Sequence, residues 1–115
     1  GLALVGILLA VYAAASMAQK FEAADRYADC SAYFFMAANA KAMAEFDNYY
    51  TAGEYAFNRV VRLVGEAGAL ERFNAASAEI NDLIERRWVD FEKADDRYGV
   101  ICADILRDAS DPFSR

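Results

Sequence analysis

Residues Cys30–Ala38 read Cys-Ser-Ala-Tyr-Phe-Phe-Met-Ala-Ala, and after Ser31 two helical turns carry no polar group except one tyrosine hydroxyl. A helix that is apolar around its whole circumference has to be covered by other parts of the chain. Helix is the expected conformation, because much of a chain that is 57% hydrophobic is alanine, with six glycines and one proline. We therefore expect this stretch to lie at the centre of an all-α domain.

The flanking sequence predicts that this stretch belongs to one long first helix. Neither glycine nor proline occurs between Gly6 and Gly53, so the helix is expected to run from the apolar N-terminus to about Asn48. No linker separates the N-terminal segment from the rest of the chain.

A second helix is predicted from a capping pattern. Thr51 and Glu54 match the Ser/Thr-x-x-Glu capping box, which places the start of that helix at Ala52. Gly65 and Gly68 predict its end, because glycine readily adopts the left-handed conformation that stops a helix.

Two further helices follow from hydrophobic spacing. Apolar residues at three- and four-residue intervals predict a third helix up to about Asp95; they are Leu70, Phe73, Ile80, Leu83, Ile84, Trp88 and Phe91. A short fourth helix is expected to carry Val100, Ile101, Cys102, Ile105 and Leu106. The expected fold is a small helical bundle of three longer helices and a short C-terminal one.

The N-terminal residues predict an exported or membrane-anchored protein, so we divide the chain into residues 1–18 and a bundle domain over residues 19–115. Leu2–Ala15 is an uncharged apolar run, and Ser16 and Ala18 place small residues at the −3 and −1 positions of a signal-peptidase site. A cleaved signal peptide, a retained membrane anchor and a buried core helix all remain open for residues 1–18.

The two cysteines, Cys30 and Cys102, are expected to form a disulfide. They lie far apart in the sequence and form no Cys-x-x-Cys motif, which argues against a zinc knuckle or a thioredoxin-like site. A disulfide requires an oxidising compartment. In a reducing compartment both would instead be small buried apolar residues.

Composition argues against several functional classes. The net charge is −6 and there is no histidine, so we expect no nucleic-acid binding, no metal, no cofactor and no catalytic residues. Two groups of carboxylates could hold a hard cation or act as an acid and base pair, but a solvated helix surface is the simpler interpretation; they are Glu79, Asp82 and Glu85, and Asp95 with Asp96.

Aromatic density marks the candidate contact surface. Tyr33, Phe34 and Phe35 are consecutive, so on a helix they point about 100° apart. A small bundle is not expected to cover all three, and these residues are therefore the candidates for binding a protein partner.

The chain also shows a family resemblance, carried by its export-like start, by the aromatic and alanine-rich helix Cys30–Ala38, and by an ending that runs from Tyr98-Gly99-x-x-Cys102 to Asp111-Pro112. In these features it resembles small uncharacterised periplasmic helical proteins of proteobacteria that have two cysteines. The resemblance implies a periplasmic helical domain pinned by a disulfide, with no known activity.

Together these features predict a non-enzymatic protein that acts as a protein-interaction or accessory factor at the bacterial envelope. The expected location is the periplasm, or the inner membrane with the domain facing the periplasm. One alternative is a single-pass accessory subunit of a larger membrane complex, anchored through residues 1–18. Another is a helical carrier of an apolar ligand.

Overall fold

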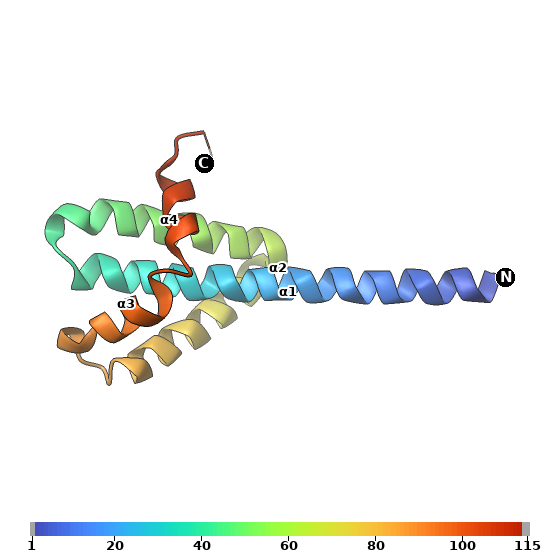
Figure 1. Ribbon diagram of the computed structural model, residues 1–115, viewed down its shortest axis with the longest axis horizontal. Helices are drawn as coiled ribbons and strands as arrows, with labels where there is room; N and C mark the ends of the chain where they lie inside the picture. The colour runs from blue at the N-terminus through green and yellow to red at the C-terminus, as the bar shows by residue number, and fades with distance from the viewer. Residues whose placement is uncertain (1, 114–115) are drawn as a thin grey trace.

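The structure, a computed structural model, describes the backbone of residues 2–113 and the side chains of residues 16–113. Every element within residues 2–113 is helical, which confirms the all-α class. The elements are α1 (Leu2–Ala40), η1 (Met43–Glu45), α2 (Phe46–Leu83), η2 (Trp88–Asp90), α3 (Glu92–Tyr98) and α4 (Ala103–Ser110). They form a small bundle from which the N-terminal part of α1 projects as one straight helix (Figure 1).

The end of α1 differs from the prediction, because the helix stops at Ala40 instead of near Asn48. Ala42 is extended, with φ −56° and ψ 143°. The ammonium group of Lys41 lies 3.0 Å from the carboxylate of Asp95 in α3. No glycine or proline occurs at this position, so the local sequence does not specify the end of the helix. The ion pair between Lys41 and Asp95 lies at this end.

The start of α2 also differs from the prediction. The helix begins at Phe46, before the predicted start at Ala52, and Thr51 therefore lies inside the helix and not at its N-cap. The ring of Phe46 stacks on that of Tyr50, with 5.6 Å between their centroids. This apolar contact extends the helix toward its N-terminus, and the capping-box prediction is wrong.

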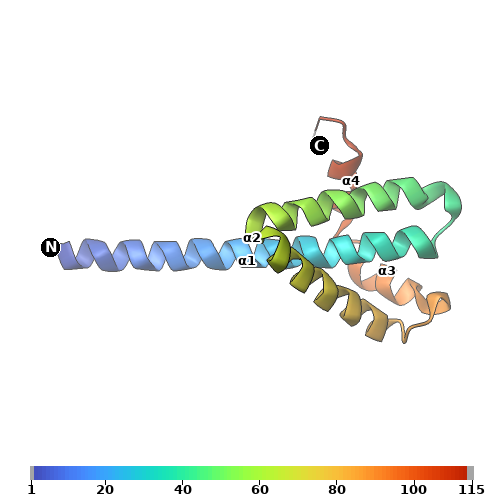
Figure 2. The same ribbon diagram turned by 180° about the vertical axis from the view of Figure 1, so that it is seen from behind.

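Gly65 divides α2 into a first half (residues 46–64) and a second half (residues 66–83). It has φ 81° and ψ 170°, a conformation that glycine adopts far more easily than other residues. The two halves diverge sharply from this point (Figure 2). The predicted helix end at Gly65 is confirmed, whereas Gly68 lies inside the second half.

The second half of α2 stops at Leu83, so the predicted third helix does not continue to Asp95. Two backbone hydrogen bonds close this end as a Schellman motif. They run from the Arg86 N–H to the Asn81 carbonyl (2.8 Å) and from the Glu85 N–H to the Asp82 carbonyl (3.1 Å).

The residues at this turn explain why the sequence does not predict the end of the helix. Glu85 and Arg86 both have positive φ, 54° and 58°, where a glycine is usual. The apolar spacing meanwhile continues past the turn through Trp88 and Phe91, so it imitates a longer helix.

The C-terminal helices lie on one side of α1. α3 and α4 are nearer the viewer in Figure 1, and the second half of α2 is nearer in Figure 2. The predicted fourth helix begins only at Ala103. Val100 and Ile101 precede it and are exposed, while Cys102 and Ile105 are buried as expected.

The core lies where α1 is surrounded by the other helices. Its largest enclosed side chains are Phe34, Ile80, Ile84, Ile105 and Val60. Burial of each contributes about 1.5–3 kcal/mol. Many remaining core residues are alanines, whose small side chains let the helices approach closely. Within the stretch Cys30–Ala38, only Phe35 and Met36 are incompletely buried.

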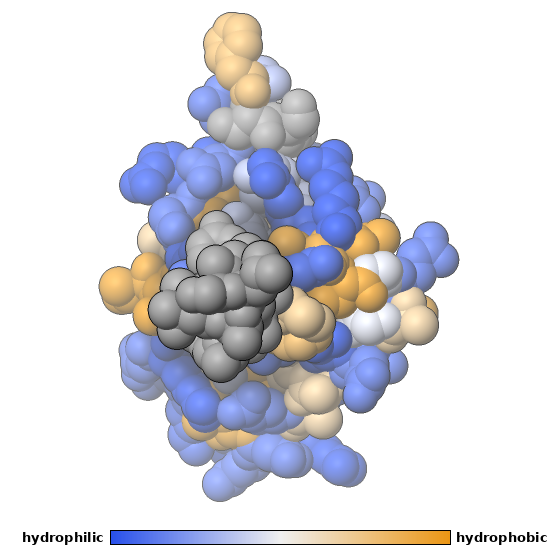
Figure 3. Space-filling view, turned by 90° about the vertical axis from the view of Figure 1, so that its right-hand side faces the viewer, coloured by the Kyte–Doolittle hydropathy of each residue, from blue (hydrophilic) through white to orange (hydrophobic). Residues whose placement is uncertain are grey.

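The predicted signal peptide or anchor falls on residues 1–18, most of whose side chains lie outside the described residues. Within the described part of the chain, none of the helices combines the length and the apolar character needed to cross a membrane. Viewed from the end at which α1 projects, the described surface is mostly hydrophilic, with separate apolar patches (Figure 3).

Candidate functional site

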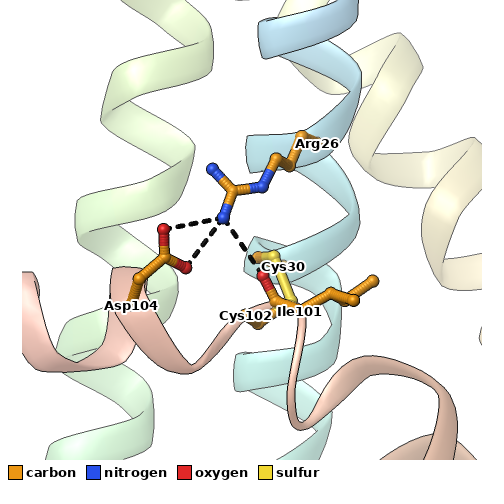
Figure 4. Close-up of a disulfide and its surroundings, with 5 residues drawn as sticks. All are labelled: Arg26, Cys30, Ile101, Cys102 and Asp104. Atoms are coloured by element: carbon orange, nitrogen blue, oxygen red, sulfur yellow. Dashed lines mark hydrogen bonds and ion pairs between the residues drawn. A yellow bond between two sulfur atoms is a disulfide. The ribbon is translucent and has the colours of Figure 1, made fainter.

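The two cysteines meet where α1 contacts the start of α4 (Figure 4). Cys30 and Cys102 are fully buried, and their sulfur atoms lie 2.10 Å apart, which is disulfide distance. Beside them the Arg26 guanidinium donates hydrogen bonds to the Asp104 carboxylate (2.7 and 2.8 Å) and to the Ile101 carbonyl oxygen (3.1 Å). The hydrogen bond from Arg26 holds the pKa of Asp104 below its ordinary value. This arrangement attaches the C-terminal helix to α1.

Tyr33, a predicted partner-binding residue, is enclosed and only 3% exposed. Its ring stacks against those of Phe91 and Tyr98, at 5.9 Å in both cases. Its hydroxyl donates a 2.6 Å hydrogen bond to Asp95, which also accepts one from Lys41 at 3.0 Å. Burial, followed by the hydrogen bond and the charge of Asp95, raises the pKa of Tyr33 far above its ordinary range. Tyr33 therefore holds α1 to α3 and offers no contact surface.

Phe34 is also enclosed, at 1% exposed, and its ring lies 6.3 Å from that of Tyr49 inside the main core. The candidate contact role of Tyr33 and Phe34 is therefore corrected, because the rings of Tyr49, Phe91 and Tyr98 pack against them and both side chains are buried. Of the three candidates, Phe35 alone keeps part of its surface exposed.

Phe35 lies between the two halves of α2. Its ring meets that of Tyr50 edge-on at 5.2 Å and that of Phe73 edge-on at 5.9 Å. A Cβ atom on Gly53 would come within 2.9 Å of the Phe35 ring, so the ring depends on glycine at that position. Phe35 is thus fixed in place from both halves of α2.

An open groove of about 280 Å³ lies beside Phe35. We call it the aromatic groove; its lining residues are Phe35, Glu54, Phe57, Asn58, Leu70 and Phe73. Leu70 is 52% exposed although it is an aliphatic residue. The lining residues come from α1 and from both halves of α2, so the groove is formed where these three helical segments meet.

A continuous series of ring contacts runs through this region, which we call the aromatic ladder. Its centroid distances are 5.6 Å for Phe46–Tyr50, 5.2 Å for Tyr50–Phe35, 5.9 Å for Phe35–Phe73 and 5.7 Å for Phe73–Phe57. None of the five side chains is fully buried. Edge-on and stacked pairs of this kind hold each ring in a defined orientation. The ladder is therefore a preorganised aromatic surface.

The groove carries little charge. Glu54 is the one charged residue in its lining, and it is exposed and has no ion pair among the described residues. Asn58 contributes an amide on the same rim. An apolar floor with one free carboxylate on its edge suits the binding of apolar side chains.

A second cleft, of about 270 Å³, is acidic and lies between α1 and the second half of α2. Burial, reinforced by the charges of Glu79 and Asp25 and opposed by Arg97, raises the pKa of Asp29 to about 6. The other carboxylates there are paired, Asp25 with Arg72 and Glu79 with Arg97, both at 3.0 Å. Within the described residues no three His, Cys, Asp or Glu side chains are grouped to hold a metal ion.

Sequence reasoning missed the other walls of the aromatic groove. Leu70 and Phe73 were assigned to the core face of the third helix, because their spacing matches that face. Leu70 is instead half exposed, five residues after the change of direction at Gly65. Gly53 was the available signal, since an interior helix glycine marks a close approach by another side chain.

Comparison with known proteins places the chain in no family: no family model, no curated protein and no solved structure matches it.

Proposed function

We propose that the protein is a non-enzymatic protein-interaction or accessory factor at the bacterial envelope, and that the aromatic groove is its contact surface. The observation that carries the proposal is the aromatic ladder, in which five rings are locked together and remain partly exposed. Rigid aromatic side chains are enriched at protein interfaces, because they bury a large apolar area at low cost in conformational entropy.

The location forms part of the proposal. A cysteine pair at disulfide distance supports an oxidising compartment, either the periplasm or the periplasmic face of the inner membrane. The buried position of both sulfurs supports a structural role, since reactive cysteines are partly exposed and lie in electropositive surroundings.

A second candidate is a single-pass accessory subunit of a membrane complex. The continuity of α1 from Leu2 to Ala40 favours it, because an anchor in residues 1–18 would be joined to the bundle without a hinge. N-terminal sequencing of the protein from its native source separates the candidates: a mature start at Gln19 excludes the anchor, and an uncleaved N-terminus supports it.

A carrier of an apolar ligand is the third candidate. The groove is open, and its volume of about 280 Å³ lies just below the range of roughly 300–1,000 Å³ usual for ligand pockets. Organic extraction of the purified full chain followed by mass spectrometry tests this candidate, which requires a stoichiometric bound lipid or similar compound.

Site-specific photocrosslinking in the native host tests the interaction role. A benzophenone amino acid at Leu70 is expected to give a discrete protein adduct. The same residue at Val100, which is 85% exposed and outside the groove, is expected to give none. The same set of adducts from both positions, or no adduct from Leu70, would contradict the proposed contact surface.

A further inference from the structure

We infer that the occupant of the aromatic groove is an amphipathic α-helix of a partner protein, with a lysine or arginine beside its apolar stripe. The inference rests on the proposed function and specifies the class of partner. Three properties of the groove support it: its helical walls, its shape and its charge.

The walls of the groove have no backbone groups to offer a partner. Both halves of α2, and α1 beneath them, are helices whose backbone hydrogen bonds are made internally. An extended peptide in the groove would find only the side chains of Glu54 and Asn58 for its own backbone groups. A helical peptide satisfies its backbone internally and presents only side chains, so it suits these walls.

The shape of the groove favours insertion of a few side chains of a partner, and not of a complete peptide backbone. The open volume of about 280 Å³ lies between the two halves of α2, where Phe57 and Leu70 stand on opposite walls. Helix-in-groove recognition uses apolar anchors at i, i+3, i+4 and i+7 in this way. The aromatic ladder extends the apolar track to Tyr50 and Phe46 along the first half of α2.

The charge of the groove selects a basic partner. Glu54 is exposed and unpaired among the described residues, and Tyr50 lies one helical turn before it with 44% of its surface exposed. A cation placed here pairs with the Glu54 carboxylate. The net charge of −6 adds a long-range attraction for a basic partner, and it opposes a second copy of the same chain.

A designed peptide serves as the probe. It is a fluorescein-labelled helix of about 18 residues with a leucine stripe and lysines on the remaining faces; two companions replace every lysine by glutamine or by glutamate. Fluorescence anisotropy with the full, oxidised chain at about 0.15 M salt measures each Kd. The lysine peptide is expected to bind about tenfold more tightly than the glutamine peptide, and the glutamate peptide more weakly than both.

Matched variants localise the binding. Leu70→Asp is expected to weaken binding of the lysine peptide by about tenfold or more, whereas Val100→Asp, with the same added charge outside the groove, changes it less than about twofold. Glu54→Gln is expected to weaken the lysine peptide about threefold to fivefold and to leave the glutamine peptide unchanged. Glu22→Gln, an equal charge change at an exposed position of α1, is the control. Circular dichroism checks folding, and Leu70→Ala, with a smaller expected loss, replaces Leu70→Asp if that variant unfolds.

Several results would overturn the inference. One is that Leu70→Asp and Val100→Asp weaken binding of the lysine peptide equally. Another is that the protein binds the glutamate peptide more tightly than the lysine peptide. A third is that the wild type forms a dimer in sedimentation experiments, that this dimer does not bind the peptide, and that Leu70→Asp abolishes it. The photocrosslinking result separates this inference from the proposed function. An adduct from Leu70 without peptide binding leaves the interaction role standing and removes the basic helix, whereas the absence of both removes both.

Discussion

The hydroxyl of Ser31 donates a 2.8 Å hydrogen bond to the backbone carbonyl oxygen of Gly53 in the interior of the bundle. One turn further along α1, the ring of Phe35 lies over the same glycine. α1 therefore makes a close contact with the first half of α2 at a residue without a side chain, and the Phe35 ring of the aromatic groove rests on that contact.

Gly53→Ala is expected to destabilise the protein by about 1–2 kcal/mol. The new Cβ would come within 2.9 Å of the Phe35 ring, and the overpacking cost of about 1–3 kcal/mol exceeds the gain of up to about 1 kcal/mol in helix propensity. Urea unfolding followed by circular dichroism measures the change. Asn74→Ala, at an exposed position of the second half of α2, is the control and is expected to be neutral or slightly stabilising. A Gly53→Ala protein as stable as the wild type would show that the contact is loose.

Alanine substitutions at two adjacent phenylalanines are expected to have different consequences. Phe34→Ala should cost about 3–5 kcal/mol, because that ring is 1% exposed and its loss leaves a cavity. Phe35→Ala should cost about 1–2 kcal/mol, because its ring is only partly covered, and it should also reduce the photocrosslink from Leu70. Urea unfolding and crosslink yield are measured on the same preparations. Equal losses of stability would place Phe35 in the core and argue against a contact role.

Reduction of the cysteine pair is expected to lower the free energy of unfolding by about 4 kcal/mol, because Cys30 and Cys102 are separated by 72 residues and their bond restricts the unfolded chain. Urea unfolding with and without reductant measures this loss. A Cys30→Ala/Cys102→Ala protein, which is expected to be insensitive to reductant, is the control. The intact mass of the wild type purified from its native source should rise by two hydrogen atoms on reduction. Detection of two free thiols before reduction would refute the pairing.

Asp29→Asn is expected to stabilise the protein at pH 7.5 and to have little effect near pH 4. The folded-state pKa of Asp29 is raised to about 6, so the folded protein binds this proton more tightly than the unfolded chain. The wild type therefore gains stability as the pH falls through 6, and loses that gain as the pH rises again. After discounting for the partial exposure of the carboxyl group, the expected difference at pH 7.5 is about 1 kcal/mol.

Urea titrations at pH values from 4 to 8 measure this difference. Asp82→Asn is the control for the charge change, because Asp82 is exposed, and its effect is expected to stay within about 0.5 kcal/mol throughout. A difference between Asp29→Asn and the wild type that is constant over the whole pH range would show that Asp29 titrates at an ordinary pKa.

The parts of the fold that could be predicted from sequence are those determined by local chemistry. Alanine content and the scarcity of glycine and proline predict helices, and Gly65 predicts a change of direction because of its backbone freedom. The meeting of Cys30 with Cys102 was expected because the sequence offers no other cysteine. The helices and the change of direction depend on the residues themselves, and the cysteine pairing follows from thiol chemistry although it joins distant segments.

The features that escaped prediction depend on contacts between distant segments. α1 ends beside the Lys41–Asp95 ion pair, and α2 ends at a Schellman turn with Glu85 where glycine is usual. The exposure of Phe35, and the enclosure of Tyr33 beside it, depend on which side of α1 receives α3. In a helix segment that is apolar on every side, the sequence pattern does not tell which side will be covered. Only the packing of the other helices decides that.

Joining Cys30 to Cys102 closes residues 30–102 into a covalent ring, and every residue that lines the aromatic groove belongs to that ring. Residues 85–87 form an exposed turn after α2, and exposed turns are the kind of segment that proteases cut. A single cut there opens the ring into a linear chain without releasing a fragment, so both walls of the groove stay on one molecule. The oxidised protein is thus built to keep its binding surface together after a first proteolytic nick.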